Sequence, residues 1–424
     1  MTDRASTSRF QISEARLAGW SYSVLLLLGF MSARAFMFVL VVTVSALLAS
    51  AAYDGMRGQR PFIAKAMPIK GIALPFALFA AFCAWGASST VWATIPANSV
   101  SKSASLTLVA GLVALGLGIL PSRKPAVVSS LTQSLAVAYV VGAAILIVDY
   151  ATLGAVKGWN SELSVRLSAV EFTRGATVLP LLMAPAIACA RQIGHIGIQR
   201  GLITAIVVLG TVAAFMSPHE TAQLAIVAAA IALGLSYVSL AGIRRLIAAG
   251  WVASCLMMLP ASIFASQPAF TNASWLPISV TDRFVIWGGF ADLATERPIQ
   301  GHGANYANTA KPSFRLIDER LRERTNPTGS VRPLPISHPH NIYLQVWVGL
   351  GAVGALLLAG FGLSMISAIS KLTAELQPLG FATMAAVATQ MLSSYSIWQY
   401  WFISIFGLAI LNLAMAHYSI LRRS

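Results

Sequence analysis

The stretch Ser337–Gly354 reads SHPHNIYLQVWVGLGAVG and joins the longest polar segment of the chain to a long apolar run. Two histidines and an asparagine, His338, His340 and Asn341, stand immediately before the apolar residues. Ionisable groups at the end of a membrane helix are costly to hold unless they face a polar site or a partner. The stretch therefore predicts a membrane helix whose first residues border a functional site.

The composition of the whole chain agrees with a membrane protein. Of the 424 residues, 57% are hydrophobic and 10% are charged, whereas a soluble domain carries about 25% charged residues. Repeated apolar runs of roughly 18 residues or more are typical of membrane helices. We therefore expect an all-α, polytopic membrane protein with about twelve transmembrane helices and one large external loop. The expected spans lie near 17–31, 35–52, 69–87, 102–120, 126–150, 172–190, 201–216, 221–240, 247–265, 341–369, 378–396 and 401–418.

These spans divide the chain into three parts: residues 1–265 with nine helices, residues 266–340 as the large loop, and residues 341–424 with three helices. Most Lys and Arg residues of the short loops fall on one side, which predicts that both termini are cytoplasmic and that the large loop is outside. Within this loop, Asp282–Thr295 and Pro312–Arg324 are predicted to be short helices that lie on the membrane surface or cover a cavity. Because the arginines of the loop face away from the cytoplasm, a nucleic-acid partner is excluded despite the net charge of +15.

Several ionisable residues are predicted at the outer ends of spans rather than at the centre of the bilayer. They are Arg34, Asp149, Glu171, Arg174, His219, Glu220, His338 and His340. This distribution favours one polar chamber that opens at the outer leaflet, and it disfavours an ion or proton pathway. The alternative is that unrelated side chains extend to the membrane interface. The three cysteines, Cys83, Cys189 and Cys255, lie in apolar runs and predict neither a disulfide framework nor a metal site.

Three motifs resemble the O-antigen ligases of Gram-negative bacteria. His340-Asn341 is followed by nine residues and then by Gly351-x-x-Gly354, at the end of the large loop. Upstream, Arg283–Trp287 and Pro298–Gly303 are similar to the Arg…Trp…Pro-x-x-Gly-x-Gly pattern of that family, and Arg174 opens a span as another family arginine does. The same motifs occur in O-antigen polymerases. The chain departs from the family at Ser217–Glu220, where many relatives have Ser-Arg.

The resemblance implies a glycosyltransferase of the bacterial inner membrane with its active site facing the periplasm. The donor would be a polysaccharide on undecaprenyl pyrophosphate, the acceptor a hydroxyl of the lipid A–core oligosaccharide, and the bilayer the surrounding medium. Inversion at the anomeric carbon and independence from ATP, metal ions and other cofactors are also implied. Two alternatives stay open: a polymerase of the same superfamily, and a non-enzymatic transporter of lipid-linked sugars, which would need charges at the midplane.

The candidate phosphate-binding residues are arginines, because a guanidinium binds phosphate oxygens bidentately and stays charged. Arg283 is the candidate on the large loop, Arg174 is the candidate at the start of the span near residues 172–190, and Arg166 is a further candidate shortly before that span. An arginine that starts a surface helix or lies in a loop is the alternative interpretation for Arg283 and Arg166.

The candidate base is a histidine, because its pKa lies near neutrality. His340 fills the motif position and is the first choice, and His338 is the second. Asn341 is predicted to orient a sugar or to cap the following helix. Gly351 and Gly354 are predicted to let helices approach closely, and no role is assigned to His302.

Overall fold

The computed structural model describes residues 14–56, 69, 71–154, 162–308 and 338–423, and the side chains of 53–55 and 162–173 lie outside that description. Helices dominate these residues. The long helices are α1 (Glu14–Met31), α2 (Phe36–Met56), α3 (Ala73–Ser88), α4 (Pro96–Ile119), α5 (Pro125–Ala151), α6 (Glu162–Ala190), α7 (Ile196–Met216), α8 (Glu220–Val238), α9 (Leu240–Ala265), α11 (Ile278–Glu296), α13 (Ile342–Ile369), α14 (Gln377–Ser393) and α15 (Tyr400–Leu421).

The predicted all-α membrane architecture is confirmed for the described residues. Nine of their helical segments are long and apolar enough to cross a membrane. Three of the twelve predicted spans, those that correspond to α1, α6 and α14, are not among these nine, and the apolar part of α6 that is described covers only Arg174–Ala190. A total of twelve spans therefore stays a prediction.

Packing in the bundle joins helices that are distant in sequence. Neighbours such as α3 and α4 do contact each other, but the most extensive packing is between α1 and α5, between α8 and α14, and between α13 and both α9 and α3. At the α1–α5 contact, the Ser134 hydroxyl donates to the backbone carbonyl of Gly19 at 2.7 Å. Small residues that let backbones approach are typical of helix contacts in membranes.

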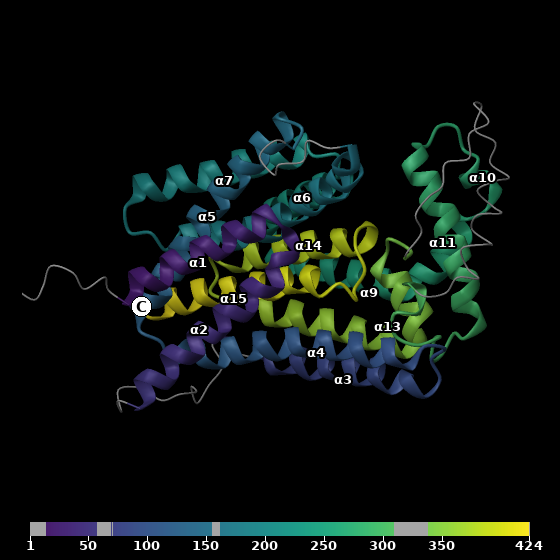
Figure 1. Ribbon diagram of the computed structural model, residues 1–424, viewed down its shortest axis with the longest axis horizontal. Helices are drawn as coiled ribbons and strands as arrows, with labels where there is room; N and C mark the ends of the chain where they lie inside the picture. The colour runs from purple at the N-terminus through teal and green to yellow at the C-terminus, as the bar shows by residue number, and fades with distance from the viewer. Residues whose placement is uncertain (1–13, 57–68, 70, 155–161, 309–337, 424) are drawn as a thin grey trace, which may run out of the picture.

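The described part of the large loop, residues 266–308 and 338–340, lies at one end of the bundle. It contains the short helix α10 (Pro268–Thr271), α11 and the 3₁₀ turn η5 (Tyr306–Asn308). The helix predicted over Asp282–Thr295 is confirmed, and it begins earlier, directly after Pro277. The helix predicted over Pro312–Arg324 falls outside the described residues. In Figure 1, α10 and α11 lie at the end of the molecule that is opposite to the C-terminus and the start of α1.

A break in α13 holds the loop against the bundle. Gly351 has φ +62° and ψ −160°, so the helix is interrupted there. The backbone of 298–303 pairs with the interrupted turn: His302 and Gly303 donate to the carbonyls of Val348 and Gly349 at 2.9 and 2.8 Å, and Ala352 donates to Pro298 at 2.8 Å. A Cβ at Gly351 would overlap the backbone of Ile299. The Pro298–Gly303 motif thus contacts the Gly351-x-x-Gly354 motif, whereas we expected Gly351 to serve a contact between helices.

Candidate active site

His338 and His340 lie in a tight turn just before α13. The Nδ1 atom of His338 accepts a hydrogen bond from the backbone N–H of His340 at 3.1 Å, and the two ring centroids are 4.2 Å apart. His340 has a positive φ of 51°. From α11, the indole Nε1 of Trp287 donates to the carbonyl of Pro339 at 3.0 Å. The turn is therefore fixed both by its own histidine and by the helix of the large loop.

Asn341 caps α13. Its Oδ1 accepts from the backbone N–H of Leu344 at 3.0 Å, its amide donates to the sulfur of Met258 at 3.2 Å, and only 1% of the residue is exposed. Capping was one of the two roles expected for this residue. Its predicted role in orienting a sugar stays a prediction, and both polar ends of its side chain already have protein partners.

Arg283 extends from the first half of α11 toward α8. Its Nη1 lies 3.9 Å from Oε2 of Glu220, and the hydroxyl of Ser279 donates to the same carboxylate oxygen at 3.3 Å. The Arg283 side chain is 29% exposed and that of Glu220 is 58% exposed. A partly buried guanidinium with one distant, exposed counter-ion keeps most of its capacity to bind an anion.

His219 joins this group from the start of α8. Its Nδ1 accepts from the backbone N–H of Ala222 at 2.9 Å, which caps the helix, and its Nε2 lies 3.5 Å from the hydroxyl of Thr177 on α6. The sequence placed His219 at an outer span end but did not select it as a site residue, because the family pattern has another residue type there. The nearness of its ring to Thr177 depends on the packing of α6 against α8.

The three histidines are neutral at pH 7. Burial is the main cause that lowers the pKa of His340 to about 4, and the positive charge of Arg283 lowers it further. Burial also lowers the pKa of His338 to about 3 and that of His219 to about 4, and the charge of His340 acts in the same direction on both. Burial lowers the pKa of Arg283 as well, while Glu220 opposes this shift. These mutual effects show that Arg283, His219, His338 and His340 form one electrostatic group.

Hydrogen bonds distinguish His340 from the other two histidines as a proton acceptor. In His219 and His338 the Nδ1 atom already accepts a backbone N–H, so the neutral ring carries its proton on Nε2. A ring N–H of His340 donates to the backbone carbonyl of Ser394. The second ring nitrogen of His340 is then the one with the lone pair, and the carbonyl orients the imidazole in the way that supports a general base.

Arg174 is connected to the group through two aromatic rings. Its Cζ is 6.0 Å from the ring centroid of Trp401, which packs on Tyr395 with 4.8 Å between ring centroids. Tyr395 in turn packs on His219 at 5.9 Å. Arg174 also precedes Thr177 by one turn of α6, so both residues lie on the same face.

Arg166 and Glu171 fall on the part of α6 whose side chains are outside the description. The predicted role of Arg166 in substrate binding therefore stays a prediction. His302, for which no role was predicted, makes a structural contact: its Nε2 lies 2.8 Å from the carbonyl of Leu293, and its ring stacks on Tyr306 with 4.5 Å between ring centroids. This contact connects the end of α11 to the Pro298–Gly303 motif.

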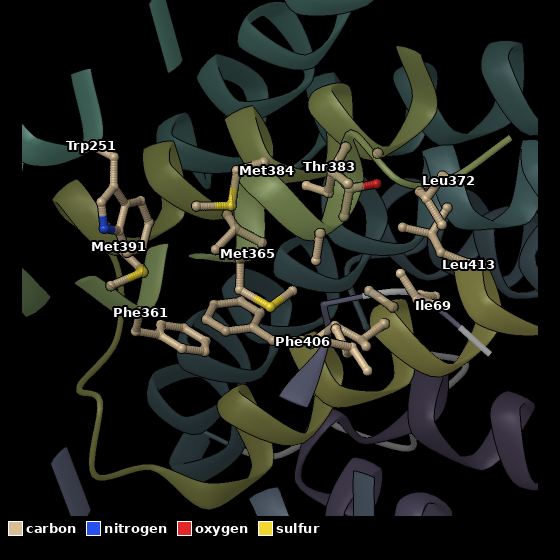
Figure 2. A pocket seen from close by; sticks show the side chains of 17 residues that line it. Ile69, Trp251, Phe361, Met365, Leu372, Thr383, Met384, Met391, Phe406 and Leu413 are labelled. Carbon is tan, nitrogen blue, oxygen red and sulfur yellow. The ribbon is translucent and has the colours of Figure 1, made fainter. Parts of the chain in front are cut away.

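A large apolar pocket lies elsewhere in the bundle. Figure 2 shows Met365, Met384 and Met391 around it, together with Phe361 and Trp251. It holds about 740 Å³ of empty space, and none of its lining residues is ionisable. The pocket suits hydrocarbon, but none of its lining residues has a charged group or a base that could take a proton in a transfer reaction. The histidine and arginine group is therefore the candidate active site.

The fold and this group define a polytopic membrane protein with a basic, imidazole-containing site at one end of its helices. Residues 205–359 match the family model described as O-Antigen ligase. That segment includes His219, Arg283 and His340, so the resemblance inferred from the motifs is confirmed over this region, in the superfamily of O-antigen ligases and polymerases.

Two relatives carry related names. A "Putative polysaccharide ligase" of Rickettsia conorii is 29% identical over 127 residues, which are 30% of this chain and 29% of the relative. A protein of the same name from Rickettsia felis is 29% identical over 128 residues, which are 30% of each chain. The matched region thus spans less than a third of the length of these relatives.

Proposed function

We propose that this protein is an O-antigen ligase, which transfers a polysaccharide from undecaprenyl pyrophosphate to the lipid A–core oligosaccharide. The observation that carries the proposal is the grouping of Arg283 with His219, His338 and His340 from three separate segments at one end of the bundle. In the proposed orientation this end faces the periplasm, the protein lies in the bacterial inner membrane, and both termini are cytoplasmic. The name of the Rickettsia relatives favours a ligase over a polymerase.

The arginines bind the leaving group in this proposal. Arg283 binds the pyrophosphate of the donor, and Arg174 and Arg166 bind further oxygens of the same lipid-linked substrate. A glycosyl pyrophosphate carries its own activated leaving group, so the transfer needs no ATP. In a site with little water, a preorganised guanidinium stabilises the charge that develops on the departing phosphate by roughly 2–4 kcal/mol.

His340 acts as the base that deprotonates the acceptor hydroxyl. A hydroxyl of the core sugar attacks the anomeric carbon, the bond from that carbon to the pyrophosphate oxygen breaks, and the hydroxyl proton goes to the unprotonated ring nitrogen of His340. A single displacement of this kind inverts the anomeric configuration. The carbonyl of Ser394 holds the ring while it gains the proton, and His338 fixes the turn.

Binding of the donor makes His340 a better base. In the free protein, burial and the charge of Arg283 hold the pKa of His340 at about 4, which is low for a base that works near neutral pH. A bound pyrophosphate neutralises Arg283 and adds negative charge nearby, and both effects raise the pKa. The proton is therefore taken up efficiently only when the donor is in place.

Reconstitution of the purified protein in nanodiscs tests the proposal. With lipid-linked glycan as donor and lipopolysaccharide that lacks O-polysaccharide (rough lipopolysaccharide) as acceptor, glycan should join the lipid A–core in the presence of EDTA and without ATP. Growth of the glycan on its lipid carrier instead would identify a polymerase. A strict requirement for a divalent metal ion would contradict the mechanism.

Histidine variants test the assignment of the base. His340→Asn should fold and reduce turnover by at least about 100-fold, the lower range of general-base effects. His338→Gln should retain more activity, because its role is to fix the turn. His195→Asn is the control, since His195 caps α7 and is absent from the active-site group. Near-normal turnover of His340→Asn would remove His340 as the base.

A further inference from the structure

Five neighbouring residues at the junction of α14 and α15 carry buried polar atoms that have no hydrogen-bond partner among the described residues. They are Gln390, Ser393, Ser394, Trp398 and Gln399. Gln390 is fully buried, and only 4% of Ser394 and 2% of Trp398 are exposed. An unpaired polar group that is withdrawn from water destabilises a fold, so such a concentration calls for a functional explanation.

The junction is nevertheless held firmly. From α13, the amide of Gln345 donates to the hydroxyl of Ser396 at 2.8 Å and its Oε1 accepts from the backbone N–H of Ile397 at 3.1 Å. The same hydroxyl of Ser396 accepts from the backbone N–H of Trp398 at 3.2 Å. Because these bonds fix the backbone, the unpaired side chains are preorganised and are not a result of loose packing.

The junction borders the active-site group. The carbonyl of Ser394 accepts from His340, and the carbonyl of Ser393 accepts from the hydroxyl of Thr221 on α8 at 2.9 Å. The ring of Tyr395 lies on His219. The junction therefore forms one wall beside the proposed base, and Tyr395 gives this wall an aromatic ring.

The chemistry of the unpaired groups fits a sugar better than a phosphate. Gln390 lies in the last turn of α14, and Ser394 directly follows that helix. Amide and hydroxyl groups both donate and accept, the indole N–H of Trp398 donates, and none of them is charged. The cations of the site, Arg174 and Arg283, come from other helices. Hydroxyl groups of a sugar would pair with neutral donors and acceptors of this kind.

We propose that Gln390, Ser394 and Trp398 bind the hydroxyl groups of the acceptor sugar beside His340. The proposal rests on the function proposed above and adds the surface that selects the acceptor. The acceptor is favoured over the donor sugar because the attacking hydroxyl must lie within hydrogen-bond reach of the base, and Ser394 contacts that base. A site built to pair with hydroxyl groups rejects sugars that lack them, because its polar groups are then left buried and unpaired.

Binding measured without donor tests this proposal. The full-length protein in nanodiscs is titrated with rough lipopolysaccharide, and Trp398→Phe, Ser394→Ala and Gln390→Leu are compared with wild type. Each variant should raise the half-saturation concentration by about tenfold, the factor for one hydrogen bond of ordinary strength. In the absence of the probe, each should keep or raise the midpoint of thermal unfolding, because an unpaired polar atom has been removed.

Two glutamines supply controls. Gln192 has a buried, unpaired Oε1 beyond the other end of α6, so Gln192→Leu should leave the affinity for rough lipopolysaccharide unchanged. Gln345→Leu removes two existing hydrogen bonds and should lower the unfolding midpoint. The combination of weaker binding with unchanged or higher stability is expected only at the three proposed residues.

The outcomes separate this inference from the function on which it rests. If the three variants bind like wild type, or lose stability with unchanged affinity, their polar atoms are paired with ordinary water and the inference is overturned. Absence of binding by the wild type overturns it too. Wild-type protein that binds the probe through these residues but transfers no glycan contradicts the proposed function alone, and normal transfer by all three variants contradicts this inference alone.

Discussion

Replacement of Gly351 by alanine should destabilise the protein by several kcal/mol. Its φ of +62° and ψ of −160° belong to a backbone region that is almost restricted to glycine, and a side chain there costs about 1–3 kcal/mol. An added Cβ would also overlap the backbone of Ile299 and lie 2.7 Å from the nitrogen of Gln300. Forcing an extra methyl group into close packing adds about 1–3 kcal/mol.

The structure offers little relief from this overlap. Moving the 298–300 backbone away would break the bonds from Ala352 to Pro298 at 2.8 Å and from Val353 to Ile299 at 3.3 Å. Each such bond contributes about 1 kcal/mol, so moving the 298–300 backbone costs as much free energy as keeping the overlap with the added Cβ. The sum for Gly351→Ala is about 2–6 kcal/mol, a large part of the total stability of about 5–15 kcal/mol that is usual for proteins.

The free energy of unfolding in mixed detergent micelles measures this effect. Gly360→Ala, in the same helix, is the matched control: the nearest atom to its added Cβ is Leu78 Cδ1 at 3.6 Å, an ordinary contact. The control should be neutral or more stable by up to about 1 kcal/mol. If Gly351→Ala unfolded within about 0.5 kcal/mol of wild type, the backbone pairing between the two glycine motifs would not have the energetic weight we assign to it.

Three further predictions concern the histidine turn. The folded pKa values of His219, His338 and His340 lie below the ordinary value of 6.5, so the unfolded chain binds more protons between pH 6.5 and about 3. The free energy of unfolding should be constant above pH 6.5 and fall as the pH drops through that range, and a flat profile would contradict the assigned burial. Asn341→Ala should lower the free energy of unfolding by about 0.5–2 kcal/mol through loss of the α13 cap, whereas Asn341→Asp should retain most of it; equal losses would exclude capping as the cause. Trp287→Phe should lower stability by about 1 kcal/mol through loss of its bond to the turn and should reduce turnover, and unchanged turnover would show that α11 does not position the base.

Those parts of the structure that depend on local chemistry were predictable from the sequence. The length of apolar runs predicts membrane helices because the bilayer leaves the backbone no other partner. The spacing of Phe284, Trp287 and Phe290 predicts a helix in the large loop, and α11 covers it. The change from polar to apolar residues after His340 marks the start of α13 to within a residue or two.

Other parts depend on contacts between distant segments, for which the sequence carries no local signal. His219 meets Thr177 across 42 positions, and Ser394 reaches His340 only because α14 ends against the start of α13. The pair Gly351 and Gly354 in an apolar run is typical of close helix contacts, yet Gly351 breaks its helix and receives a loop instead. The left-handed backbone of that glycine decides between the two uses, and it cannot be read from residue type.

The positive φ of His340 lowers the stability of the fold at a residue that the proposed reaction requires. Glycine adopts the left-handed backbone without strain, whereas a histidine in this conformation costs of order 1–3 kcal/mol of folding free energy. His340→Gly should therefore yield a protein that resists heat better than wild type and transfers almost nothing. If this trade-off holds, selection for thermostability alone would favour replacement of His340, and a thermostable variant of this protein should be sequenced at residue 340 before its activity is assumed.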